Sequence, residues 1–392
     1  MKIRSILSII LVSLLFVLTA CAGSNDTHPT EVTKAVSPTE KGAGSDKELG
    51  EAFTRIVRSD GMQGAVLAVH GGEEVYAEGF GEALDGVPNT VDTLYGVASI
   101  TKQFTAAGIL QLYENKKLDL DDKLSRFFPD YVHSEKITLR QLLSQRSGIP
   151  DYSVETREEK IVAFCDGDET LSEAVTLSTD NTAAENIALI RDMVFSSDLS
   201  FTPGERFDYS DSNYGLLAAI IEKVSGMSYH DYVREHIFKP LHIAHASFID
   251  DSADVKDAVI AQTDRVAFSE DYYAVKGAEY GCGDLLISPR ELYLWYRGLF
   301  GGKVVGEASL KMMTTNYSTE EGIGYGFGLM LATVGGSEVM YHTGWIPSCS
   351  SAVFYIPDKD YCQIVSGNRS VGNPHQVAIA LLDQAIERLS LS

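Results

Sequence analysis

Strand-like segments lie at both ends of this 392-residue chain, and helix-like segments occupy its middle. Near the beginning, residues 65–69 and 74–79 have the pattern of two strands joined through Gly71-Gly72, which predicts a hairpin. Near the end, four strand-like segments precede an amphipathic helix over residues 375–389. These segments are 325–332, 338–342, 350–356 and 361–366. This segregation is typical of an α+β fold, in which the two ends form one lobe and the helical middle is inserted as a second lobe.

The change of pattern along the chain also predicts where the lobes divide. We expect an α/β lobe from residues 51–120 and 300–392, and a mainly helical lobe from 121–299. The main helices expected in the middle are 138–144, 182–194, 214–224, 229–236 and 289–299. Because ligands commonly bind between lobes, the cleft where they meet is the default position of the functional site.

The N-terminus has the features of a secretory leader. Lys2 and Arg4 precede an apolar run over residues 6–18. The next residues form a Leu-Thr-Ala-Cys motif that ends at Cys21 and resembles the bacterial lipoprotein box. This resemblance implies that residues 1–20 are a lipoprotein signal peptide and that Cys21 is lipidated. An uncleaved single-span anchor and ordinary secretion with a free cysteine are the alternatives.

A flexible tether is expected after the leader. Residues 21–50 are rich in Ser, Thr, Pro, Gly and charge and contain little that could be buried in a core. The folded domain would then begin at residue 51. If Cys21 carries acyl chains, its lipid attaches the domain to a membrane, and the protein is extracytoplasmic and anchored to the bacterial cell envelope.

Charge and cysteine spacing exclude several classes of function. The chain has 55 acidic and 32 basic residues, a net charge of -23, so nucleic acid is not an expected partner. Four further cysteines, at positions 165, 282, 349 and 362, show no C-x-x-C spacing. We therefore predict no zinc, no other metal and no organic cofactor. The oligomeric state is left open.

Ser99 and Lys102 form a Ser-x-x-Lys motif where a strand-like segment leads into a helix over residues 99–114. Three residues of separation place both side chains on one face of a helix. A serine hydroxyl becomes a nucleophile when a neighbouring group takes its proton, and helix N-terminal amides can support the resulting oxyanion. The motif is common by chance, but its position at a strand-to-helix junction favours a catalytic role.

Several longer stretches resemble the serine beta-lactamase and penicillin-recognising enzyme family. They are LYGVASITKQFTAAGILQLYENKKLDLDDKL, ITLRQLLSQRSGIPDY, PGERFDYSDSNYGLLAAIIEKVSG, GYGFGLML and YHTGWIPSCSSAVFYIP, and they cover nearly all of residues 51–392 in family order. Within the family, the similarity is to the class C beta-lactamase, D-alanyl-D-alanine carboxypeptidase and related esterase branch. It implies an antiparallel sheet flanked by helices, with the active site in the cleft beside the helical lobe.

The resemblance also implies roles for individual residues. Ser99 would be the acylated nucleophile, Lys102 its proton partner, and Tyr209 the general base or the relay of the leaving-group proton. On the opposite wall, the family strand corresponds to the substrate-binding residues His342, Thr343 and Gly344. Backbone N–H groups of Ser99 and Trp345 would form the oxyanion hole.

Two residues depart from the family pattern. Asp211 stands where the second motif usually has Asn, and a carboxylate near Lys102 would favour its ammonium form. Tyr209 then becomes the favoured proton acceptor, as a phenolate stabilised by that cation. His342 stands where class C beta-lactamases have Lys, and a mostly neutral imidazole attracts a beta-lactam carboxylate less strongly, so we expect weak beta-lactam hydrolysis.

Two aromatic residues complete the expected substrate site. Trp345 would narrow the space beside the oxyanion hole, and Tyr152 would line the cleft mouth or pack in the core. The sequence thus predicts a serine hydrolase that cleaves an amide or ester of a small molecule or short peptide through an acyl-serine, such as a D-amino-acid peptidase, carboxypeptidase or esterase. The alternatives are a weak class C-like beta-lactamase, a penicillin-binding sensor without turnover, and a structural lipoprotein.

Overall fold

The structure is a computed structural model, and it describes residues 47–391 apart from 85, 153–180, 252–265, 268–276, 319–323, 335, 347–348 and 369–371. The predicted signal peptide, the lipidation site Cys21 and most of the predicted tether lie outside the described residues. The expected tether boundary at residue 50 is wrong, because helix α2 (Lys47–Asp60) already begins at Lys47 and buries Leu49. Among the described helices, none is both long and apolar enough to cross a membrane.

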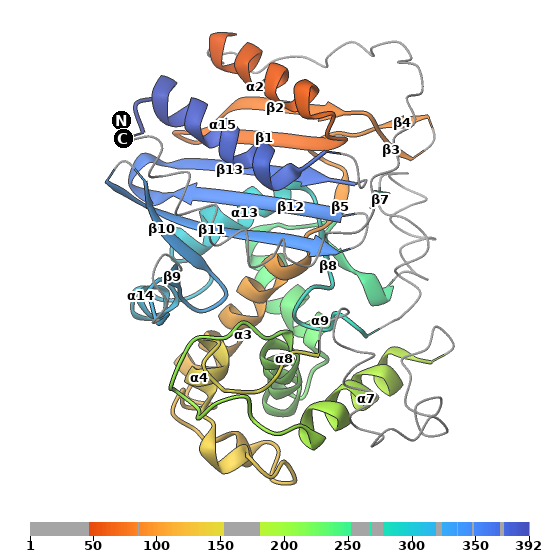
Figure 1. The fold of residues 1–392 in the computed structure, drawn as a ribbon, viewed down its shortest axis with the longest axis vertical. Helices are drawn as coiled ribbons and strands as arrows, with labels where there is room; N and C mark the ends of the chain where they lie inside the picture. Colours follow the sequence, from red (N-terminus) through yellow and green to blue (C-terminus); the bar gives the residue numbers. More distant parts are fainter. Residues whose placement is uncertain are drawn as a thin grey trace.

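The main sheet has seven strands in the order β2-β1-β13-β12-β11-β10-β9, and each neighbouring pair is antiparallel (Figure 1). Its strands are β1 (Gly64–His70), β2 (Glu73–Phe80), β9 (Gly324–Tyr325), β10 (Met330–Val334), β11 (Ser337–Ile346), β12 (Cys349–Ile356) and β13 (Tyr361–Gly367). Strand β1 pairs with β13 from Gly64 opposite Gly367 to His70 opposite Tyr361. The two ends of the chain therefore build one sheet, and the predicted α+β fold class is confirmed.

The stretch 325–332 was expected to be one strand, but the structure divides it into β9 and β10. Gly328 lies in the intervening loop with φ +70°, and a Cβ there would be only 2.7 Å from the backbone oxygen of Lys102. The loop turns back against the beginning of helix α3 (Lys102–Glu114), and this close approach requires glycine. The interruption brings the end of β9 toward the site described below.

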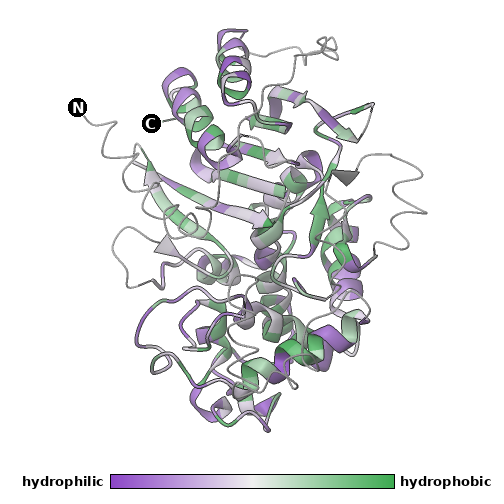
Figure 2. Ribbon diagram, turned by 45° about the vertical axis from the view of Figure 1, so that its right-hand side comes forward, coloured by the Kyte–Doolittle hydropathy of each residue, from purple (hydrophilic) through white to green (hydrophobic). Residues whose placement is uncertain are grey.

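Helices cover both faces of the main sheet. On one face, α2 packs beside α15 (Pro374–Arg388), and both bury apolar residues against the strands (Figure 1). Figure 2 shows that hydrophobic residues of these helices alternate with hydrophilic ones, as expected for helices with one solvent-facing side. On the other face, α13 (Pro289–Phe300) contacts β13 and β1. The expected boundary between the helical lobe and the α/β lobe, at residue 299, therefore lies too late in the chain, because α13 packs on the sheet.

Helix α3 joins the sheet to the helical lobe. Ten of its thirteen residues are buried, including residues on every side, so it is a central core helix. The remaining helices are α4 (Leu139–Leu143), α7 (Ala183–Ser196), α8 (Asp211–Ser225), α9 (Tyr229–Val233), α10 (Lys239–Leu241) and α14 (Glu307–Met313). Of these, α8, α9 and α14 contact α3, and α4 and α7 pack on α8. A π-helical turn spans Arg234–Phe238, and short 3₁₀ turns span Ala98–Thr101, Leu124–Arg126, Ser134–Lys136, Ile249–Asp251 and Pro357–Lys359.

The chain also contains short strands outside the main sheet, of which the sequence pattern indicated only the one that leads to Ser99. A second sheet has the order β6-β8-β5-β7, and a two-stranded sheet pairs β3 with β4. These short strands are β3 (Glu82–Leu84), β4 (Val87–Pro88), β5 (Leu94–Gly96), β6 (Ser247–Phe248), β7 (Val266–Ala267) and β8 (Leu285–Ile287). Two or three residues are too few to show a period of two. The second sheet holds β5, which leads directly into the turn that carries Ser99.

Candidate active site

Ser99 and Lys102 lie where β5 leads through a 3₁₀ turn into α3. Ala98, immediately before Ser99, has φ +45°, a left-handed conformation that is uncommon for a residue with a side chain. This turn leaves Ser99 partly exposed, whereas Lys102 is fully buried at the first position of α3. Lys102 Nζ lies 3.1 Å from Ser99 Oγ. The expectation that the two side chains share one face is met.

Three oxygen atoms surround Lys102 Nζ. Besides Ser99 Oγ, Nζ contacts the backbone oxygen of Cys282 at 2.8 Å and Asp211 Oδ1 at 2.6 Å. Burial lowers the pKa of Lys102, but the Asp211 carboxylate, together with smaller effects of Tyr209, Cys282 and Tyr325, outweighs this, and the net pKa lies well above the ordinary value. Lys102 is therefore an ammonium that donates to Ser99 Oγ and to the Cys282 carbonyl and forms an ion pair with Asp211, and the charge is the one expected from the presence of Asp211.

Asp211 is placed by the beginning of α8. The preceding Ser210 has extended backbone angles, and the helix starts at Asp211, where a negative charge is favourable. The backbone N–H of Asp211 donates to Asp151 Oδ1 at 3.0 Å. The Asp211 side chain is 16% exposed, so a substrate in the site can approach the Lys102–Asp211 ion pair.

Tyr209 lies beside the same lysine. Lys102 Nζ is 4.9 Å from the centre of its ring, so the side chain is directed into the site. The hydroxyl is buried and has no hydrogen-bond partner among the described residues. Burial raises the pKa of Tyr209 well above its ordinary value, and Lys102 opposes this only in part. The expected resting phenolate is thus wrong: desolvation outweighs the nearby cation, and the resting group is a neutral phenol.

Strand β11 forms the opposite wall and carries His342, Thr343, Gly344 and Trp345. His342 is buried, and its Nδ1 donates to the backbone oxygen of Thr343 at 2.6 Å. Burial, with the Lys102 cation adding to it, lowers the pKa of His342 to about 3. The imidazole is therefore neutral at neutral pH, in agreement with the sequence-based expectation.

Gly344 allows β11 to lie against the turn before Ser99. A Cβ on Gly344 would be 2.1 Å from the backbone oxygen of Val97, which is far inside any permitted contact. The next residue, Trp345, is 42% exposed, although most of the strand is buried. Strand β11 therefore brings an exposed indole close to the nucleophile.

Tyr152 is not at the mouth of a cleft. Its side chain is only 3% exposed, and its hydroxyl donates to the backbone oxygen of Ala278 at 2.8 Å and lies 3.2 Å from Cys282 Sγ. The second of the two sequence-based interpretations, packing in the core, is the one observed. Its hydroxyl holds the loop that carries Cys282.

The loop around Cys282 is not among the predicted site residues, yet the backbone oxygen of Cys282 accepts a hydrogen bond from Lys102. Gly281 has φ +69°, and a Cβ there would be 2.3 Å from the Ala218 side chain. Glycine thus allows the loop to pack closely on α8. The Gly281-Cys282-Gly283 spacing is the only sequence signal for it, because a backbone carbonyl needs no particular side chain.

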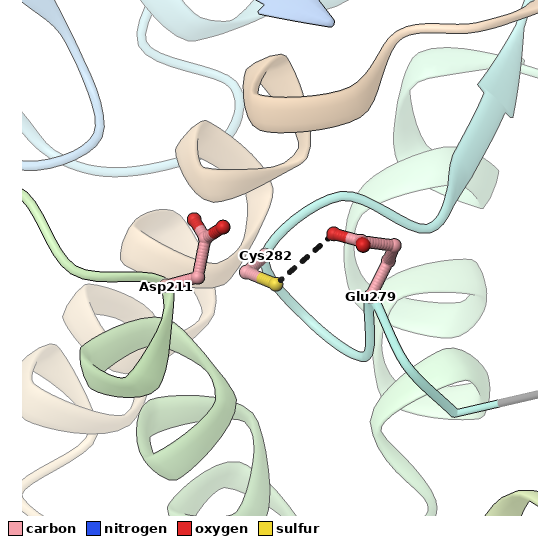
Figure 3. Close-up of side chains that lie close together, drawn as sticks. All are labelled: Asp211, Glu279 and Cys282. Carbon is pink, nitrogen blue, oxygen red and sulfur yellow. Dashed lines mark hydrogen bonds between the residues drawn. The ribbon is translucent and has the colours of Figure 1, made fainter. Parts of the chain in front are cut away.

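Two groups in the described part of the chain have the residue types of a metal site. One is Asp211, Glu279 and Cys282, and the other is His230, Asp250 and Asp284. Figure 3 shows the first, in which Cys282 Sγ lies 3.8 Å from a Glu279 oxygen. Burial raises the pKa of the Cys282 thiol, which disfavours the thiolate that a metal would need. In the second group His230 Nε2 lies 2.7 Å from Asp284 Oδ2. We assign no metal to either.

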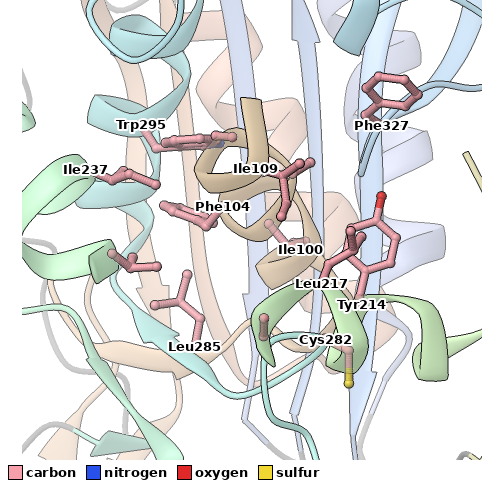
Figure 4. Close-up of a cluster of buried hydrophobic side chains, with 14 of the residues drawn as sticks. Ile100, Phe104, Ile109, Tyr214, Leu217, Ile237, Cys282, Leu285, Trp295 and Phe327 are labelled. Atoms are coloured by element: carbon pink, nitrogen blue, oxygen red, sulfur yellow. The ribbon is translucent and has the colours of Figure 1, made fainter. Parts of the chain in front are cut away.

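The apolar surroundings hold these groups in place. Figure 4 shows Ile100 and Phe104 with Cys282 and Tyr214 in one hydrophobic cluster that packs around α3. The polar atoms of the site are therefore bordered by a close-packed core, which limits the movement of Lys102 and of the Cys282 loop.

Comparison with known proteins identifies the family. The Beta-lactamase family model matches residues 49–387. The putative penicillin-binding protein PbpX of Bacillus subtilis (strain 168) is 29% identical over 319 residues, which are 77% of this chain and 75% of the relative. The octameric penicillin-binding protein homologue from Pyrococcus abyssi has a TM-score of 0.68 at 29% identity, covering 87% of this chain and 76% of that one.

A third similar structure is a D-stereospecific amidohydrolase from Streptomyces sp., with a TM-score of 0.64 at 27% identity. The match covers 87% of this chain and 99% of that chain. The family model spans most of the chain, and the fold is the one shared by these structures. This chain belongs to the Beta-lactamase family of serine hydrolases.

Proposed function

We propose that the protein hydrolyses an amide or ester bond through an acyl intermediate on Ser99. The observation that carries this proposal is the contact of 3.1 Å between Ser99 Oγ and Lys102 Nζ, at a partly exposed serine beside a fully buried lysine. A serine hydroxyl next to a group that can exchange a proton is the arrangement that nucleophilic catalysis needs.

The ion pair supplies a route for the serine proton. The Lys102 ammonium cannot accept a proton, but it can pass one to Asp211 Oδ1, which is 2.6 Å away. In this step the Ser99 O–H bond breaks and an N–H bond forms at Lys102, while a different N–H bond of Lys102 breaks and an O–H bond forms at Asp211. After these transfers Asp211 is a neutral acid, Lys102 is still an ammonium, and the negative charge has moved to the Ser99 oxygen, which attacks the carbonyl carbon.

The remaining steps use groups on the two walls. Backbone N–H groups of Ser99 and Trp345 stabilise the negative oxygen of the tetrahedral intermediate. The close packing of Gly344 on Val97 supports this assignment, because it brings β11 beside the nucleophile turn. The Tyr209 phenol donates the proton that the leaving group needs and becomes a phenolate. Water then attacks the acyl-serine and gives a proton to this phenolate, while Ser99 recovers its proton from Asp211 through Lys102.

We propose D-amino-acid amides or short peptides as the first substrates to examine, with small esters next. The similar D-stereospecific amidohydrolase supports this order, as do the penicillin-binding relatives. Carboxypeptidase and esterase activities both fall within the same chemistry. Beta-lactams are expected to be poor substrates, because the neutral His342 provides no positive charge for their carboxylate.

Intact mass spectrometry tests this proposal. The purified protein is exposed to a fluorophosphonate and to a penicillin, with Ser99→Ala as the control, and turnover is measured on p-nitrophenyl esters and D-amino-acid amides. We expect one adduct on the parent protein, none on the variant, and turnover of at least one substrate class. A penicillin adduct that persists without turnover would instead indicate a sensor. No adduct and no turnover would indicate a structural protein.

We also propose that the domain is tethered to the outer face of a bacterial membrane through lipid on Cys21. The support is the apolar leader and the Leu-Thr-Ala-Cys motif in the sequence. Expression of the whole chain and of Cys21→Ser in a bacterium, followed by membrane fractionation and mass spectrometry of the N-terminal peptide, tests it. We expect a diacylated Cys21 peptide in membranes and loss of that fraction in the variant.

A further inference from the structure

A second tyrosine, Tyr325, lies next to the proposed proton donor. It is at the end of the short strand β9 and is fully buried. Its ring centre is 6.0 Å from that of Tyr209 and 6.3 Å from that of His342, and the Tyr209 and His342 rings are also 6.3 Å apart. The three rings therefore form one triangle beside Lys102.

Each member of this triangle has a buried polar atom that makes no hydrogen bond of good geometry within the described residues: the hydroxyls of Tyr209 and Tyr325 and Nε2 of His342. Looser hydrogen bonds link Tyr209 to Lys102, and Tyr325 to Tyr214 and Gln145. A buried polar group without a partner is costly and rare in folded proteins. Three such atoms on neighbouring rings indicate that they satisfy one another, directly or through water.

The hydrogen-bonding capacities of these atoms are complementary. Because Nδ1 of His342 donates to Thr343, its Nε2 can only accept. Each phenol can donate one hydrogen bond and accept others. Gln145 Nε2 is a donor that also lacks a partner, while its Oε1 accepts from Ser210 N and Asn213 Nδ2. A chain from Gln145 through the two phenols to His342 would thus use one N–H of Gln145 and the O–H of each phenol.

The electrostatics connect Tyr325 to the reacting groups. Burial raises the pKa of Tyr325 to about 12, and the Lys102 cation, with Tyr214 and Gln145, opposes a larger rise. Tyr325 in turn contributes to the raised pKa values of Lys102 and Tyr209. Tyr325 is therefore within the field of the site, although its ring also packs against Phe207.

We propose that Tyr325 is a positioning residue for Tyr209: its hydroxyl donates a hydrogen bond to the Tyr209 oxygen, directly or through one water molecule, while Tyr209 donates to Nε2 of His342. This proposal rests on the proposed function of the site. The bond holds the Tyr209 phenol in one orientation, from which its proton can pass to the leaving group.

The test uses Tyr325→Phe, which removes only the hydroxyl and keeps the ring contacts. The matched control is Tyr361→Phe, another fully buried sheet tyrosine, whose hydroxyl donates to Gln363 on β13. Both variants are checked by circular dichroism melting. For Tyr325→Phe we expect kcat to fall about tenfold with little change in KM, because one hydrogen bond that lowers the barrier is lost. The control Tyr361→Phe should retain activity.

A spectroscopic measurement separates this proposal from the proposed function. Tyrosines are labelled with ¹³C at Cζ, and the Tyr209 signal is assigned with Tyr209→Phe. We expect Tyr325→Phe to shift the Tyr209 signal and Tyr361→Phe to leave it in place, whether or not a substrate has been found. An unmoved Tyr209 signal overturns the proposal, and so does a moved signal with unchanged kcat in the active enzyme. Failure of Ser99 to be acylated counts only against the proposed function.

Discussion

Lys102 and Asp211 form a buried ion pair, with 2.6 Å between Nζ and Oδ1, at the junction of the two central helices α3 and α8. The lysine side chain is fully buried and the aspartate side chain is 16% exposed. Each charge is tolerated because the other is present, so the pair serves the stability of the fold as well as the chemistry of Ser99.

Removing the cation alone should destabilise the protein. For Lys102→Met we expect a loss of about 3–5 kcal/mol in the free energy of unfolding, because Asp211 is left as a poorly solvated charge. Urea denaturation of Lys102→Met and of Lys102→Met/Asp211→Asn measures this. The double variant should recover part of the lost stability, yet neither should acylate Ser99. Equal stability of the single and double variants would show that the unpaired Asp211 carboxylate does not cause the loss of stability.

Removing the anion should reverse the direction of the Lys102 pKa shift. In the folded parent the pKa of Lys102 is raised, so the pair's contribution to stability is present at neutral pH and is lost only above about pH 10.4, as the lysine deprotonates. In Asp211→Asn burial, the largest influence on Lys102, is opposed only by the smaller effects of Tyr209, Cys282 and Tyr325, so the pKa of Lys102 falls. The stability of the variant should then decrease as the pH is lowered from 10 to 7. Unfolding measured across that range checks the sign.

The same variant should change the pH dependence of acylation. With its pKa lowered, Lys102 can lose its proton nearer neutral pH and act as the base itself, so the acylation rate of Asp211→Asn should rise with pH along a lysine titration. The parent rate should not show that titration. Stopped-flow measurement of p-nitrophenyl ester bursts from pH 6 to 10 gives both profiles. Identical profiles would remove Asp211 from the mechanism.

Burial of His342 should appear in the acid stability of the protein. Its folded pKa of about 3 is below the unfolded value of about 6.5, so its contribution is present above pH 6.5 and is lost as the pH falls toward 3. The free energy of unfolding of the parent and of His342→Gln is measured between pH 7 and 4. It should fall less steeply with decreasing pH in the variant. Beta-lactam acylation should not increase between pH 8 and 6, because the imidazole stays neutral.

Gly344 should not tolerate a side chain. Gly344→Ala places a Cβ 2.1 Å from the Val97 oxygen, so we expect a loss of about 1–3 kcal/mol and a large fall in acylation as β11 moves away from Ser99. The control is Gly50→Ala in α2, where the nearest atom is 3.7 Å away and alanine favours the helix. That control should be neutral or slightly stabilising. Equal behaviour of the two variants would contradict the assigned close contact.

Much of the architecture could be predicted from periodicity. The hairpin of β1 and β2, the late strands β11 to β13 and the closing helix α15 have long, clear patterns, and the structure contains them. The strands β6 and β8 were missed because two or three residues show no period, whereas β5 was expected from the strand-like segment before Ser99. The division between β9 and β10 was missed because it depends on how Gly328 packs on Lys102, a contact between segments far apart in the chain.

The sequence by itself determined which chemical groups are available: Ser99 and Lys102 at a helix start, a carboxylate at position 211 and an imidazole at position 342. Only the tertiary structure decided their protonation. Lys102 remains charged because folding places Asp211 against it, whereas Tyr209 and His342 remain neutral because folding buries them. Desolvation and Coulomb energies depend on distances and burial in three dimensions, and spacing along the chain does not specify either.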